Sequence, residues 1–165
     1  MYHLLATRAV DTYRLLDGFR VDSLQRARIG GIYTEMIKAY RHRNGAEDAV
    51  ILATLDYWKW KVAGGGINRE PYAAYRERKE ELNKEYLEVL DNLIREYGGR
   101  EICAEVYIDK AGWLRGLGAS YMDEVLQVCD EGVKRYSAYK RINELRNIRE
   151  SVLQPYLNVS TQESV

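Results

Sequence analysis

The residue types that most often catalyse reactions or bind metals are scarce in this chain. Its 165 residues include only two histidines, His3 and His42, and two cysteines, Cys103 and Cys129. A zinc site needs about four nitrogen or sulfur ligands, and these residues show none of the usual ligand spacings. His42 lies between two arginines, which favours a cationic helix end over a general base. We therefore expect no metal, no cofactor and no catalytic residue, and a protein that is not an enzyme.

Three glutamates, Glu81, Glu85 and Glu88, are spaced to share one face of a helix. Such a carboxylate stripe resembles half of a di-metal site. A di-metal helical bundle would also need a Glu-x-x-His motif on two helices, and the sequence has none. A solvated, charged helix face is therefore the better interpretation of this stripe.

Basic residues gather in two parts of a chain whose formal net charge is +0. Residues 1–43 hold eight basic and four acidic side chains, and residues 132–154 hold six and two. Tyrosines interleave with the bases in the second part, as on surfaces that stack on nucleic-acid bases. The candidate nucleic-acid-binding residues are Lys134, Arg135, Tyr139, Arg141, Arg146 and Arg149. Acids at the start of a helix and bases at its end also suit the helix dipole, so nucleic-acid binding is the alternative hypothesis.

The aromatic composition is unusual, with 14 Tyr and 3 Trp against a single Phe. The tyrosine hydroxyl needs water or a polar partner, so tyrosine suits half-buried surfaces. Tyr, Trp and Arg also dominate the hot spots of protein interfaces. Trp58 and Trp60 lie two residues apart near a predicted helix end, so they cannot both face one core. We predict that partner binding uses Trp58, Trp60, Tyr72, Tyr75, Trp113 and Tyr156.

Targeting and membrane signals are missing from the sequence. The N-terminal segment reaches charged residues too soon for a signal peptide, and no apolar run approaches the roughly 20 residues that span a bilayer. We expect a cytoplasmic or virion protein that does not enter membranes. A disulfide between Cys103 and Cys129 is conceivable, but in the cytoplasm two reduced, buried thiols are favoured.

Hydrophobic spacing of about 3.6 residues predicts helices in the first part of the chain. These helices cover residues 2–16, 23–43, 47–62 and 69–97, with the run Gly64–Gly66 as a flexible connection. After Gly98 and Gly99 the apolar residues alternate with a period of two, and a turn signal follows at residues 109–112. This pattern predicts a small β-hairpin over about residues 102–115.

One long helix is predicted after the hairpin, beginning near Met122, with Gly132 as the place for a bend. It should end before Pro155, because the residue preceding a proline is pushed out of the helical region. Residues 155–165 would then form an extended polar tail. The predicted fold is mainly α, a bundle of about five helices with the hairpin inserted before the last one. Residues 1–154 would form a single domain.

The leading hypothesis for function is a non-enzymatic structural or assembly protein. It would be a subunit of a homo-oligomer or of a larger particle, such as a virion connector or head-completion component. Its partners would be copies of itself and other subunits. The alternative is a helical protein that binds nucleic acid with the basic face of the last helix. Many arginines, tyrosines and potential ion pairs also favour an origin in a hot environment.

Overall fold

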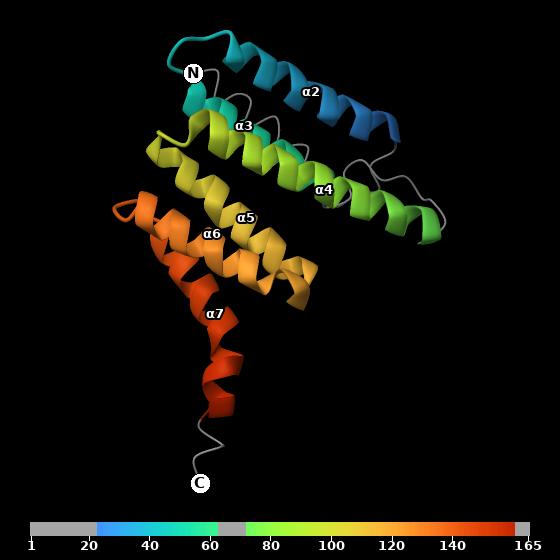
Figure 1. Cartoon of the computed structure of the whole chain (residues 1–165). Helices are drawn as coiled ribbons and strands as arrows, with labels where there is room; N and C mark the ends of the chain where they lie inside the picture. The colour runs from blue at the N-terminus through green and yellow to red at the C-terminus, as the bar shows by residue number, and fades with distance from the viewer. Residues whose placement is uncertain (1–22, 63–71, 161–165) are drawn as a thin grey trace. The chain divides into compact units, whose positions relative to one another are not determined.

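The structure is a computed structural model that describes residues 23–62 and 72–160, with side chains placed for residues 27–62 and 76–154. In these ranges the chain forms six α-helices, two short 3-10 helices and no strand (Figure 1). The elements are α2 Ser23–Arg41, α3 Glu47–Trp60, α4 Tyr72–Tyr97, η2 Glu101–Cys103, α5 Ala104–Leu117, η3 Ala119–Tyr121, α6 Met122–Arg135 and α7 Ile142–Ser160. The mainly α class is confirmed. The predicted first helix, the Gly64–Gly66 connection and residues 161–165 lie outside the described residues.

The chain divides into two compact units, Met1–Glu88 and Val89–Val165. In the first unit α2 packs along α3. The buried residues Ile29, Tyr33 and Tyr40 are four and seven positions apart, which places them on one side of α2. Met36 of α2 and Tyr57 and Trp60 of α3 pack against Ile29 and Tyr33. An amphipathic stripe therefore holds this helix pair together, as the spacing predicted.

In the second unit α5, α6 and α7 contact one another pairwise. The run from Cys103 to Ile108 is buried at every position, so the start of α5 forms the centre of this unit. Leu114 of α5, Val125 of α6 and Leu145 of α7 are fully buried around it. Three helices thus close around one core.

The β-hairpin predicted over residues 102–115 is wrong, because this segment forms the end of η2 and most of α5. The alternation of Ile102, Ala104, Val106 and Ile108 suggested a strand with one buried face. The intervening residues Cys103, Glu105 and Tyr107 are buried as well. A short apolar run that is buried on all sides is compatible with a central helix as well as with a strand. Here α6 and α7 both pack against the segment, which is helical.

The single last helix is also wrong, since a turn at residues 136–141 separates α6 from α7. Gly132 does not bend the chain but lies buried within α6. Its role is close packing: a Cβ there would lie 2.6 Å from Cδ1 of Leu145 and 3.0 Å from Cβ of Tyr107. The missing side chain lets α7 fold back tightly on α6 and α5.

The expected helix end before Pro155, and with it the extended tail from residue 155, is wrong for residues 155–160. The backbone of α7 stays helical through Pro155 to Ser160. A proline inside a helix removes one backbone hydrogen bond and crowds the preceding turn, at a cost of about 3 kcal/mol. A helix can therefore contain a proline when other interactions compensate for this loss of stability.

Candidate functional site

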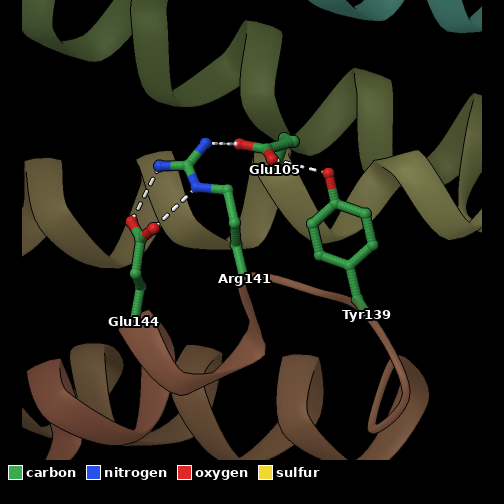
Figure 2. A network of polar contacts seen from close by, with 4 residues as sticks. All are labelled: Glu105, Tyr139, Arg141 and Glu144. Carbon is green, nitrogen blue, oxygen red and sulfur yellow. Dashed lines mark hydrogen bonds and ion pairs between the residues drawn. The ribbon is translucent and has the colours of Figure 1, made fainter.

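The most extensive polar contacts in the described structure surround Glu105, in the first turn of α5. The side chain of Glu105 is 10% exposed. The hydroxyl of Tyr139 donates a 2.6 Å hydrogen bond to its Oε1, and Nη1 of Arg141 lies 2.5 Å from its Oε2. On its other side Arg141 donates from Nε and Nη2 to both oxygens of Glu144, at 2.6 and 2.8 Å (Figure 2). We call these four residues the Glu105 cluster.

The Glu105 cluster joins the turn between α6 and α7 to the centre of the second unit. Burial and the hydrogen bond to Glu105 raise the pKa of Tyr139. The hydrogen bond to Glu144 and the charge of Glu105 raise the pKa of Arg141, although partial desolvation lowers it. Tyr139 therefore remains a proton donor and Arg141 remains charged. The arrangement fixes the turn to α5, and neither side chain is activated for proton transfer.

A second polar group lies nearby, where α6 ends. The hydroxyl of Tyr107 donates to Oε1 of Glu131 at 3.0 Å, and Nη2 of Arg135 pairs with the same oxygen at 2.7 Å. The hydroxyl of Tyr136 donates to the carbonyl oxygen of Gly98 at 2.6 Å. Burial raises the pKa of Tyr136 to about 12. Tyrosine hydroxyls thus bond a carboxylate and a backbone carbonyl oxygen at this end of the unit.

The candidate nucleic-acid-binding residues lie on three segments, because the predicted last helix is two helices and a turn. Arg135, Arg141 and Arg149 pair with carboxylates of the same chain; Arg149 lies 2.6 Å from Asp130. Tyr139 is buried in the Glu105 cluster, so its ring offers little stacking surface. Lys134 is exposed, and exposed Arg146 donates to Asn143 at 2.6 Å.

The predicted partner-binding residues Trp58 and Trp60 are half-buried on different sides of α3. Trp58 stacks on Tyr86 of α4 with ring centroids 5.9 Å apart and planes at 8°. Lys61 lies above the Trp58 ring at 4.1 Å and pairs with Glu85 at 3.2 Å. Trp60 instead packs toward α2, with its ring centroid 6.0 Å from that of Tyr33. Both indoles have aromatic contacts inside the first unit, and both keep some exposed surface.

Of the other predicted partner-binding residues, the structure describes the side chain of Trp113 and only the backbone of the three tyrosines. Trp113 is half-buried on α5. Tyr72 and Tyr75 lie in the first turn of α4, and Tyr156 lies near the end of α7, but their side chains are outside those described. Tyr156 is nevertheless on a helix and not on the extended tail that the sequence predicted.

The two cysteines are free and buried. Burial raises the pKa of Cys103, and it raises that of Cys129 to about 11. The described residues contain no group of three or more His, Cys, Asp or Glu side chains that could hold a metal ion. Among the helices that the structure describes, none combines the length and apolar character needed to cross a membrane.

Sequence reasoning missed Glu105, Tyr107 and Tyr136 as members of polar clusters. A signal was present, because an acid inside the apolar run from Ile102 to Ile108 must either face water or find partners. The pairing of Glu105 with residues 34 and 36 positions later depends on the turn between α6 and α7, which local patterns did not reveal.

Comparison of the chain with protein-family models, curated proteins and solved structures finds no match.

Proposed function

We propose that the protein is a non-enzymatic structural subunit that assembles with copies of itself through the C-terminal half of α7. The observation that carries this proposal is the reach of α7, whose C-terminal half continues past α5 and α6 of its own unit (Figure 1). Val152, 4% exposed, is the last core residue among the described side chains of this helix. A helix end that continues past the helices packed beside it presents surface to another chain.

The sequence of this helical end suits helix docking. Leu153, Tyr156 and Leu157 occupy positions i, i+3 and i+4, the spacing that produces one apolar face on a helix. Apolar faces of this kind dock into grooves or onto other helices. Tyr156 is one of the residues that the aromatic composition had marked for partner binding.

The same segment is a poor helix former on its own. Pro155 lowers helix stability by about 3 kcal/mol in a helix interior, and most helical stability in proteins comes from packing of an apolar face. Helical structure past Pro155 is therefore best explained by a stabilising partner. A second copy of the chain is the simplest partner, because two-fold dimers bring the same segment of two chains together.

The ion pairs favour assembly over nucleic-acid binding. Phosphate contacts need basic groups that can exchange their counterions for phosphate. Arg135, Arg141 and Arg149 already lie within 2.7 Å of carboxylate oxygens. These carboxylates offset part of the positive charge that a phosphate would meet at the three arginines.

Sedimentation equilibrium over a range of concentrations tests the proposal on the full chain. We expect a mass above that of one chain, reduced by Leu157→Lys, because a charge on the apolar face opposes its burial. Asn158→Lys adds the same charge at the neighbouring position and should leave the mass unchanged. Circular dichroism would establish that both variants keep their helix content.

Two results would overturn the proposed assembly. One is a full chain that sediments as a monomer at every concentration. The other is an equal mass for Leu157→Lys and Asn158→Lys, which would place the contact elsewhere. Deleting residues 155–165 provides a second measurement, since it should produce the same monomer as Leu157→Lys.

A further inference from the structure

An open hollow of about 430 Å³ lies in the second unit, where α4 and α6 end. Gly98, Gly99 and Glu101 form one side of it, and Arg135, Tyr136 and Ser137 contribute to the other. None of the interactions described for the proposed assembly involves these residues. The hollow is therefore a separate feature of the molecule.

Two opposite charges line this hollow without pairing to each other. The side chain of Arg135 is 47% exposed and pairs with Glu131, outside the hollow lining, at 2.7 Å. Glu101 is exposed, and its carboxylate makes no ion pair or hydrogen bond with any residue that the structure describes. A guanidinium has five N–H donors, so the pairing with Glu131 leaves donors for a ligand.

Two of the lining residues, Gly98 and Tyr136, are held in place by a hydrogen bond and by close packing. Tyr136 is 7% exposed, and its hydroxyl donates to the carbonyl oxygen of Gly98 at 2.6 Å. A Cβ at Gly98 would lie 2.5 Å from the carbonyl oxygen of Ile94, so this close approach requires glycine. A Cβ at Gly99 would meet no atom within 4 Å. A side chain added at Gly99 would thus occupy open space and not force the backbone apart.

One part of the hollow offers negative charge and hydrogen-bond acceptors, and another part offers positive charge and hydrogen-bond donors. The C-terminal ends of α4 and α6 leave carbonyl oxygens without helical partners and carry the negative ends of the two helix dipoles. Together with Glu101 they favour an ammonium group. Arg135 and the exposed hydroxyl of Ser137 are donors that favour a carboxylate. Complementarity to both requires a ligand with one charge of each sign.

We propose that this hollow binds a small zwitterion of the α-amino acid class. The ammonium group of the ligand pairs with Glu101, and its carboxylate pairs with Arg135 and accepts a hydrogen bond from Ser137. This inference is independent of the proposed assembly, because it uses other residues and predicts binding by a single chain.

Amide NMR titration of the full chain tests the binding site with three probes. L-Alanine carries both charges, N-acetyl-L-alanine lacks the ammonium and L-alanine amide lacks the carboxylate. We expect saturable shifts of the Gly98, Gly99 and Ser137 amides with L-alanine, and affinity about tenfold or more weaker for each singly charged probe, the size of a lost charge-assisted hydrogen bond.

Three variants localise the effect. Glu101→Gln should weaken binding of L-alanine and L-alanine amide but not of N-acetyl-L-alanine. Gly99→Leu should abolish binding by filling the hollow. Glu150→Gln, which removes one exposed carboxylate from α7, should leave binding unchanged. Absence of saturable shifts, equal affinity for the three probes, or equal binding by Glu101→Gln and the unmodified chain would each overturn the proposal.

Discussion

At Gly132, the absence of a side chain lets α6 pack closely against Leu145 of α7 and Tyr107 of α5. Alanine is the better helix former by about 1 kcal/mol, so propensity alone predicts that a glycine inside α6 is unfavourable. A Cβ at this position would lie 2.6 Å from Cδ1 of Leu145 and 3.0 Å from Cβ of Tyr107. Steric exclusion therefore outweighs propensity, and glycine is the residue that fits.

We predict that Gly132→Ala lowers the free energy of unfolding by about 1–3 kcal/mol, the usual cost of overpacking a core. Gly112→Ala is the matched control, because Gly112 lies within α5 and a Cβ there would meet no atom within 4 Å. The control should gain up to about 1 kcal/mol from propensity. Urea unfolding followed by circular dichroism measures both changes. Equal stabilisation by both substitutions would contradict the packing argument.

At the scale of the elements, α7 combines two halves with different physical support. Its first half is part of the core, with Leu145 fully buried and Val152 at 4% exposure. The hydroxyl of Ser151 accepts a 3.0 Å hydrogen bond from Nη1 of Arg115 on α5. Its second half contains Pro155 and continues past α5 and α6. Helix stability should therefore fall along α7 toward Ser160.

We predict that Pro155→Ala strengthens the end of α7, because it restores the backbone hydrogen bond that the proline lacks. Amide hydrogen exchange of residues 156–160 should slow by about tenfold or more. Gln154→Ala is the control, since residue 154 already donates its N–H within the helix and should change exchange little. Unchanged exchange in Pro155→Ala would show that the proline does not limit this segment.

At the scale of the whole molecule, a formal net charge of +0 combines with a high density of internal ion pairs. Lys110 illustrates the pattern: its side chain is only 12% exposed and its Nζ lies 2.8 Å from Asp91 and 3.4 Å from Glu124. Arg135, Arg141 and Arg149 of the second unit likewise pair with acids of that unit. Sequence charge counts overstate the positive charge that a polyanion would meet.

We predict that the full chain shows no saturable binding to duplex DNA or to single-stranded RNA at physiological salt, measured by fluorescence anisotropy. The test for the alternative function is salt dependence, because phosphate contacts weaken steeply as salt rises. Saturable binding that weakens with salt and is lost in the double variant Lys134→Glu/Arg146→Glu would favour the nucleic-acid hypothesis instead. Both residues are exposed, so these reversals should leave the fold intact.

Local patterns in the sequence were enough to predict the helices that have one buried face. The spacing of Tyr33, Met36 and Tyr40 identified α2, and the glycine pair after Tyr97 marked the end of α4. Free, buried cysteines also followed from composition. These features depend on residues within a few positions of one another, which is the range over which periodicity carries information.

Tertiary contacts alone decided the rest. The alternating apolar residues between Ile102 and Ile108 suit a strand, but residues 103–108 are all buried, and a central helix accommodates this burial. The turn that separates α6 from α7 is held by Tyr136 and Tyr139, whose hydroxyls bond Gly98 and Glu105, 38 and 34 positions away. The hollow beside Arg135 exists because two helix ends far apart in sequence meet. Such contacts form only when the chain folds back on itself. The periodicity of hydrophobic residues and the pattern of charges do not show which distant segments will meet.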